Sequence, residues 1–231
     1  MGEGEGVNRW LGAAAGVGVL AGVYLALVVA PPDAVQGQVY RILYLHVPSV
    51  LTAYLAIGVV FVCSIGYLKT RSLRWDAVAR ASAELGVLFI GLTLVTGSIW
   101  GKPTWGAWWT WDARITTTAI LFVIYVGYLM LRAFADDEVT GARYAAVLGI
   151  IGTLDIPVIH MSVYWWRTLH QPATVLRPGR PAMAWEMLVV WAVNIAALWL
   201  VYAYLLAVRV RLEGVRRAAL DLRLRRAQSA R

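Results

Sequence analysis

The 231-residue chain contains six apolar runs that are long enough, or nearly long enough, to cross a lipid bilayer. A spanning helix needs roughly 20 mostly apolar residues. The runs lie at 10–30, 47–68, 84–100, 115–131, 144–163 and 184–208. Because 60% of all residues are hydrophobic, the composition excludes an ordinary soluble domain. We therefore predict an all-α integral membrane protein, a bundle of six transmembrane helices.

The six runs form one domain over residues 1–231, because no repeat, low-complexity segment or soluble insertion separates them. Two polar residues inside the runs need an explanation. Asp155, close to Pro157, is either a functional residue in the membrane or a group that bonds to backbone freed by the proline or stays protonated. We interpret Asn194 as a residue that hydrogen-bonds two helices together.

Basic residues predict the orientation. With six spans both termini lie on one side, and that face carries 15 Lys and Arg against 6 on the other. The positive-inside rule then places both termini in the cytoplasm. Eight of these arginines fall in the tail 209–231, which accounts for much of the net charge of +8. Anionic lipid or a cytoplasmic subunit explains this tail better than nucleic acid does.

The N-terminus does not look like a cleaved signal peptide, and the cysteine content does not suggest covalent haem attachment. We expect 10–30 to be a retained span, because residues 1–6 carry two glutamates and no small-residue cleavage pattern follows. The single cysteine, Cys63, excludes an intrachain disulfide, and there is no Cys-x-x-Cys-His motif. Cys63 is interpreted as a small core residue, and the chain is not itself a c-type cytochrome.

Five tryptophans fall within twelve residues of the predicted second outer loop: Trp100, Trp105, Trp108, Trp109 and Trp111. A membrane-interface belt normally uses one or two at each helix end. Five indoles followed by Asp112 and Arg114 suit a platform for a large, flat ligand with charged groups. Anchoring of the loop among lipid headgroups is the alternative.

All three histidines are predicted at the same face as the tryptophans. His46 precedes Pro48, which fits the first turn of the second span, and His170 lies in the third outer loop. His160 lies about one turn inside the fifth span and is either a structural hydrogen-bonding residue or an alternative ligand. Histidines that approach from two loops suit the axial positions of a haem iron. A structural role for each histidine is the alternative.

Charged residues near these histidines fit the edge of a porphyrin. Lys102, Arg114 and Arg167 are available for its propionates, because Arg binds carboxylates in a bidentate way. We expect Asp112 either to orient a histidine N–H or to form an ion pair with Arg114.

The same residues carry a resemblance to a known family. The sequence resembles the tryptophan-rich WWD signature of membrane haem-handling proteins at Trp100-Gly101, Trp105 and Trp109-x-Trp111-Asp112-x-Arg114-Ile115-Thr116. The flanking segments resemble the haem exporter protein C (CcmC) family of cytochrome c maturation at Tyr44-Leu45-His46-Val47-Pro48 and Trp165-Trp166-x-Thr168-Leu169-His170-Gln171. The likeness covers all three outer loops, and six spans is the size of that family.

The resemblance implies a specific task. Members of this family hold haem b at the outer face of the membrane and promote its attachment to a periplasmic haem chaperone, CcmE. They work beside an ABC transporter complex with the ATPase CcmA and the membrane subunits CcmB and CcmD. The paired ligand histidines map to His46 and His170. The full predicted haem site adds Trp100, Lys102, Trp105, Trp108, Trp109, Trp111, Asp112, Arg114 and Arg167.

Other functions fit the sequence less well. The chain has no Walker-type glycine loop, so it is not the ATPase, and it lacks the paired catalytic groups of a hydrolase. We predict no enzyme activity. A b-type cytochrome would also use two histidines, but it would place them inside facing helices. A small-solute permease would need more polar residues along the spans than Asp155, Asn194 and scattered Ser and Thr.

Overall fold

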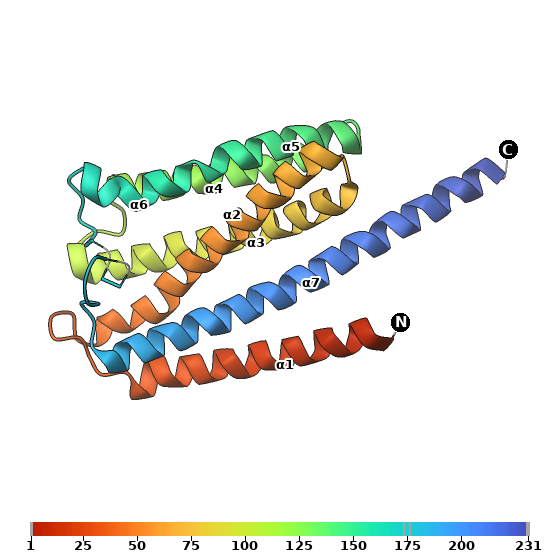
Figure 1. Cartoon of the computed structure of the whole chain (residues 1–231). Helices are drawn as coiled ribbons and strands as arrows, with labels where there is room; N and C mark the ends of the chain where they lie inside the picture. Colours follow the sequence, from red (N-terminus) through yellow and green to blue (C-terminus); the bar gives the residue numbers. More distant parts are fainter. Residues whose placement is uncertain (1, 173, 176, 230–231) are drawn as a thin grey trace.

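The structure, a computed structural model, describes residues 2–172, 174–175 and 177–229, and every regular element among them is helical. Six of its helical segments are long and apolar enough to cross a membrane, in agreement with the six predicted runs. The elements, drawn in Figure 1, are α1 (Gly2–Tyr24), η1 (Leu25–Val29), η2 (Gln38–Ile42), α2 (Leu43–Thr70), α3 (Leu73–Trp105), α4 (Ala113–Phe134), α5 (Glu138–Thr153), α6 (Asp155–Trp165) and α7 (Trp185–Ser229).

Helices α2 to α6 pack around a core of Ala, Ile, Leu and Tyr side chains, and α7 lies between this group and α1 (Figure 1). Cys63 belongs to this core and is 5% exposed, which confirms its predicted role. The connections before η2, between α3 and α4 and after α6 gather with α6 at one end of the bundle, here called the loop end (Figure 1). Both termini lie at the other end (Figure 1).

One amide hydrogen-bonds α7 to α1 within their long contact. Asn194 Nδ2 donates to the Gly22 carbonyl across the helix pair at 3.2 Å and to the Val190 carbonyl in its own helix at 2.8 Å. A side chain at position 22 would meet Asn194 Oδ1 at 2.6 Å, so only glycine permits this approach. The predicted role of Asn194 as a helix–helix bond is confirmed.

Helix α3 extends beyond the predicted apolar run 84–100 at both ends. Helix α3 begins at Leu73 rather than at residue 84, and it ends at Trp105 rather than at residue 100. Its first turns carry Arg74, Asp76 and Arg80, which the hydropathy of a single segment treats as a stop. Two of these charges are paired by neighbouring helices: Asp76 by Arg132 of α4 and Arg217 of α7, and Arg80 by Glu213 of α7.

The fifth span is not one continuous helix. Helix α5 ends at Thr153 and α6 begins at Asp155, with a turn at Leu154 between them. Pro157 cannot donate to the carbonyl of Thr153, which weakens the helix at this point. No hydrogen bond from a described residue reaches Asp155 Oδ2. The interpretation in which that oxygen binds freed backbone groups therefore gains no support.

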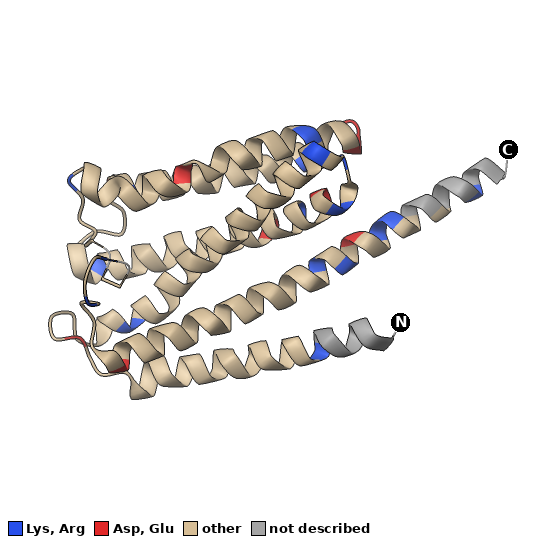
Figure 2. Cartoon of the chain, viewed as in Figure 1, with Lys and Arg blue, Asp and Glu red and all other residues tan. Residues whose placement is uncertain are grey.

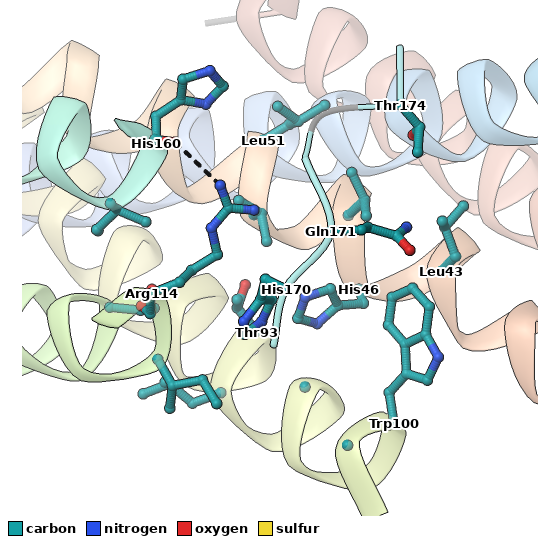
Figure 3. A pocket seen from close by; sticks show the side chains of 18 of the residues that line it. Leu43, His46, Leu51, Thr93, Trp100, Arg114, His160, His170, Gln171 and Thr174 are labelled. Atoms are coloured by element: carbon teal, nitrogen blue, oxygen red, sulfur yellow. Dashed lines mark hydrogen bonds between the residues drawn. The ribbon is translucent and has the colours of Figure 1, made fainter. Parts of the chain in front are cut away.

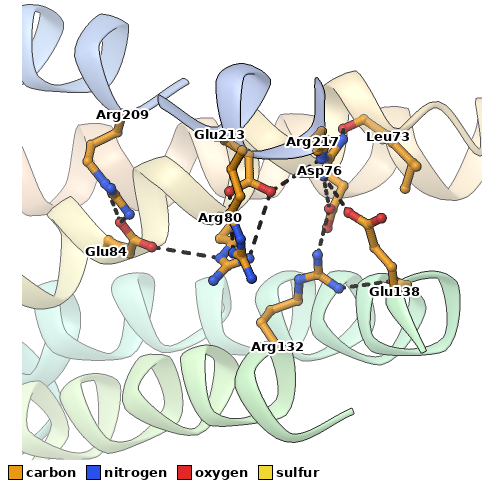
Figure 4. A network of polar contacts seen from close by, with 10 residues as sticks. Leu73, Asp76, Arg80, Glu84, Arg132, Glu138, Arg209, Glu213 and Arg217 are labelled. Atoms are coloured by element: carbon orange, nitrogen blue, oxygen red, sulfur yellow. Dashed lines mark hydrogen bonds and ion pairs between the residues drawn. The ribbon is translucent and has the colours of Figure 1, made fainter. Parts of the chain in front are cut away.

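Ion pairs join four helices at the end opposite the loops, and they form the network in Figure 4. Arg132 of α4 binds Asp76 of α3 at 2.8 Å, and their side chains are only 3% and 2% exposed. Arg217 of α7 reaches Asp76 at 3.2 Å and Glu138 of α5 at 2.9 Å. Farther along α7, Arg209 pairs with Glu84 of α3. Lys, Arg, Asp and Glu gather toward the bundle ends (Figure 2).

This network changes the picture of the basic tail. Residues 209–229 continue α7 as one helix, and Arg209 and Arg217 bond to the bundle instead of projecting freely. Residues 230 and 231 of the predicted tail lie outside the described residues. Part of the tail is therefore structural, because its arginines bond α7 to α3 and α5.

Arg132→Ala tests this network. Removing the guanidinium takes the shorter of two ion pairs from a buried carboxylate, and we expect the free energy of unfolding to fall by about 3 kcal/mol. Arg216→Ala is the matched control: its side chain is 67% exposed and pairs only loosely with Glu213 at 3.7 Å, so we expect a loss below about 0.5 kcal/mol. Thermal unfolding in detergent measures both, and equal losses would contradict the assignment.

Candidate haem site

A cavity of about 280 Å³ opens at the loop end of the bundle, between α2, α3, α4, α6 and the connection that follows α6. Most of its lining is apolar, and a few polar side chains project into it (Figure 3). Five of the eleven predicted site residues line it: His46, Trp100, Trp105, Arg114 and His170. Histidines from two segments 124 positions apart in the sequence therefore line one cavity.

His46 lies in the first turn of α2, which the short 3₁₀ segment η2 leads into. The helix begins at Leu43, earlier than predicted, so Pro48 lies inside α2 and not at its first turn. The expectation that Pro48 marks the helix start is therefore wrong. His46 is nevertheless held rigidly, because it is part of a helix that is packed against α3.

Helix α3 provides the surface on which the His46 ring rests. His46 Nδ1 lies 2.9 Å from the hydroxyl of Thr96. The neighbouring Gly97 leaves room for the ring, since a side chain there would meet His46 Cε1 at 3.1 Å. The Trp100 indole stands edge-to-face with the ring at 5.7 Å between centroids and donates its N–H to Gln36 Oε1 at 2.7 Å.

His170 is held by a carboxylate rather than a hydroxyl. Its Nδ1 lies 3.1 Å from Asp112 Oδ1, and the Trp105 ring stands edge-to-face with it at 4.7 Å. Burial lowers the pKa of the His170 imidazole, although Asp112 opposes that shift. A lowered pKa favours the neutral ring, which is the form that binds metals.

Asp112 organises this part of the site. As the N-cap of α4, its Oδ1 accepts from the backbone N–H of Arg114 at 2.9 Å. Its Oδ2 accepts from the backbone N–H of Leu169 at 2.7 Å, which fastens the third loop to α4. Burial alone would raise the pKa of Asp112, but the Leu169 amide, His170 and the Arg114 amide outweigh it and hold the pKa below its ordinary value.

Two interpretations of Asp112 were open from the sequence, and the structure decides between them. Asp112 meets the ring nitrogen of His170, so it orients a histidine. Toward Arg114 it accepts from the backbone amide, whereas the Arg114 guanidinium donates elsewhere.

Arg114 projects its guanidinium along the cavity (Figure 3). Its Nη2 donates to the backbone carbonyl of His160 at 3.1 Å. Its Nε is buried and has no hydrogen-bond partner among the described residues. A half-buried cation with a free buried donor is suited to an anionic group of a ligand. His160 contacts Arg114 through its backbone carbonyl and not through its imidazole.

The tryptophans divide into two sets. Trp100 and Trp105 belong to the last turns of α3 and line the cavity, so the prediction that all five lie in a loop is wrong. The helix ends at Trp105, and its C-cap residue Gly106 has a φ of 79°, a conformation that favours glycine. Trp109 and Trp111 pack edge-to-face on each other at 5.7 Å. Trp108 and Trp111 are 59% and 83% exposed, and none of these three lines the cavity.

The other two predicted cations also lie outside the cavity. Lys102 Nζ donates to the Gly106 carbonyl at 3.1 Å, where it closes the end of α3, and Arg167 is exposed. Arg114 is thus the only predicted cation that lines the cavity described here.

Three residues that support the cavity were not predicted from the sequence: Thr96, Gly97 and Gln36. Thr96 and Gly97 precede Trp100 by four and three residues, so they share its helix face. That spacing was a usable signal, because residues 96, 97 and 100 all lie within the predicted run 84–100. Gln36 offered no comparable signal, because it lies in a turn 64 residues away from its partner Trp100.

The chain is similar to known proteins over most of its length. The family model described as heme exporter protein C matches residues 4–225. A heme exporter protein C of Bradyrhizobium diazoefficiens is 38% identical over 221 residues, which is 96% of this chain and 84% of that protein. The Escherichia coli K12 protein of the same name is 42% identical over 179 residues, 75% of this chain and 71% of its own length. A putative cytochrome c biosynthesis ccmC-like mitochondrial protein of Marchantia polymorpha is 41% identical over 157 residues, covering 68% and 66%.

Asp112→Ala tests the fastening of the third loop. We expect it to cost more stability than the roughly 1 kcal/mol of an ordinary N-cap, because it also frees the Leu169 amide and the His170 ring. Asp137→Ala is the matched control: Asp137 caps α5 through Thr140 N at 2.8 Å. Limited proteolysis should cut the connection 166–184 faster in Asp112→Ala alone. Equal cutting in both variants would contradict the fastening.

Proposed function

The chain belongs to the heme exporter protein C family, and we propose that its cavity holds haem b between His46 and His170 for transfer to the periplasmic chaperone CcmE. At the level of the family it is a multi-pass, haem-handling membrane protein of cytochrome c maturation, not a catalytic enzyme. Haem is its cargo. The single observation that carries the proposal is that both histidines line one cavity and that each is held through Nδ1.

The residues of the cavity fit haem on three counts. A ring fixed through Nδ1 offers Nε2 to a metal, and two such rings supply both axial positions of a haem iron. Apolar side chains of α2, α3 and α4 suit the porphyrin face. Arg114 has a free buried donor for a propionate.

The remaining predicted residues receive narrower roles. Trp105 and Trp100 support the two histidines from the edge. Trp108, Trp109 and Trp111 lie at the loop-end surface, where we propose that they contact the chaperone or lipid headgroups. Lys102 and Arg167 have no place in propionate binding in this proposal.

We propose that the protein lies in a bacterial inner membrane. Its loop end faces the periplasm and both termini lie in the cytoplasm. The excess of basic residues at the terminal end supports this orientation. The ATPase CcmA and the membrane subunits CcmB and CcmD are the proposed partners, and they follow from family membership.

The electron-transfer alternative receives less support. A b-type cytochrome holds haem between facing helices at bilayer depth. His46 lies in the first turn of α2 and His170 in a connection, both at the loop end. A site near the membrane surface suits delivery of haem to a soluble chaperone.

The first experiment is an absorption spectrum of the detergent-purified protein, oxidised and reduced. We expect a low-spin bis-histidine haem spectrum in the wild type, and we expect the His46→Ala/His170→Ala double variant to lose it while still inserting. His160→Ala is the control, because His160 also lines the cavity but contacts Arg114 only through its backbone carbonyl. Wild-type protein without haem, even when CcmE is co-expressed, would overturn the proposal.

Arg114→Gln tests propionate binding. Loss of a buried, charge-assisted contact should weaken haem affinity by roughly tenfold or more. The matched control Arg167→Gln should leave affinity unchanged, because Arg167 is exposed and outside the cavity. Haem titration followed by absorbance compares the two. Equal weakening would show that overall charge, and not position, attracts haem.

Trp105→Ala tests the support of His170. We expect it to impair loading of CcmE more than Trp75→Ala or Trp10→Ala, because neither of those residues lines the cavity. Haem bound covalently to co-expressed CcmE is the measurement. Similar loading in all three variants would favour a general interfacial role for the tryptophans.

A further inference from the structure

The two histidines differ in what holds them, and this difference has a consequence for how haem leaves. We propose that Thr96 is a positioning residue that presents His46 as a haem ligand, and that His46 is the weaker of two unequal ligands, so that the bond to His46 opens first. This inference rests on the proposed function and adds to it a residue and an order of release.

The hydrogen bonds of Thr96 fix the tautomer of His46. A hydroxyl has one hydrogen to donate. Thr96 donates it to the Leu92 carbonyl one turn earlier, at 2.7 Å. Toward His46 Nδ1, at 2.9 Å, the same oxygen can only accept. With the hydroxyl hydrogen on the Leu92 bond, His46 carries its proton on Nδ1, which leaves Nε2 unprotonated and able to bind iron.

The partner of His170 fixes the same tautomer by a stronger contact. An ionised carboxylate only accepts hydrogen bonds. Asp112 is 9% exposed and accepts from three donors: Leu169 N, Arg114 N and His170 Nδ1. His170 therefore also presents an unprotonated Nε2, and its N–H points at a negative charge.

These two partners give the rings unequal donor strength. A carboxylate that accepts the N–H proton increases the basicity of the opposite ring nitrogen. A neutral hydroxyl does so less, because it carries no negative charge, even though its bond to the Leu92 carbonyl strengthens it as an acceptor. We therefore expect the bond from His170 to be the stronger one.

The supports of the two histidines agree with this order. His46 is fixed in α2 against Thr96, Gly97 and Trp100 of α3, so it cannot follow a departing ligand. His170 lies in the connection after α6 and is held at Asp112. Haem that detaches from His46 first would remain bound to His170, which lies in the connection after α6.

Single histidine variants test the order. The full-length protein in detergent is titrated with haem and followed by absorbance. We expect His46→Ala, which keeps the carboxylate-backed ligand, to bind haem about tenfold more tightly than His170→Ala. The reverse ranking, or equal affinities, would overturn the proposed inequality.

A matched pair at position 96 tests the role of Thr96. Thr96→Val has nearly the same shape but no hydroxyl, and we expect it to weaken haem binding roughly tenfold. Thr96→Ser keeps the hydroxyl and should bind as the wild type does. In a His46→Ala background Thr96→Val should have no effect, because the ring on which it acts is absent. A loss that persists in that background would mean a packing role and would overturn the inference.

The reduction potential of bound haem separates the two ligands by sign. Asp112→Asn removes the negative charge behind His170, so we expect the potential to rise. Thr96→Val should change it much less. Comparable shifts would overturn the inequality. Wild-type protein without haem would instead remove the proposed function, whereas a bis-histidine wild type with unchanged Thr96→Val would leave that function intact and reject this inference alone.

Discussion

The carboxylate of Asp112 is the contact on which the loop end of this protein depends. It begins α4, fastens the third connection through the Leu169 amide and orients the His170 ring. These donors come from two chain segments almost 60 residues apart. Because a buried carboxylate is costly unless its oxygens are satisfied, the three contacts stabilise one another. A loop that would otherwise be variable in position thereby becomes part of a defined cavity.

Polar chemistry is divided between the two ends of the bundle. At the loop end it shapes a cavity with two fixed histidines and one cation, Arg114. At the opposite end Asp76, Arg132 and Arg217 bond α3, α4 and α7 together. The apolar middle must remain compatible with lipid, so specific polar contacts are confined mainly to the ends. The network therefore keeps the helices in register while the cavity end carries out the proposed function.

The errors of prediction share a physical origin. Hydropathy ended the third span short at both ends, because Asp76 is paired by Arg132 from another helix and Trp105 packs on His170 from another loop. Likewise, Lys102 and Arg167 are as basic as Arg114, yet only Arg114 faces the cavity. A linear pattern records which residues are charged or aromatic. It does not record which of them a distant segment will contact.

The sequence alone determined the six apolar helices, the pairing of His46 with His170 as candidate ligands and the family resemblance. Each of these depends on properties that a segment carries by itself: hydropathy, residue type and local motif. Tertiary structure decided which tryptophans reach the cavity, which of two roles Asp112 takes and that Thr96 lies beneath His46. Those results depend on contacts such as His46–Thr96 and His170–Asp112, which join residues 50 and 58 positions apart. Only packing of the helices brings such residues within hydrogen-bond distance.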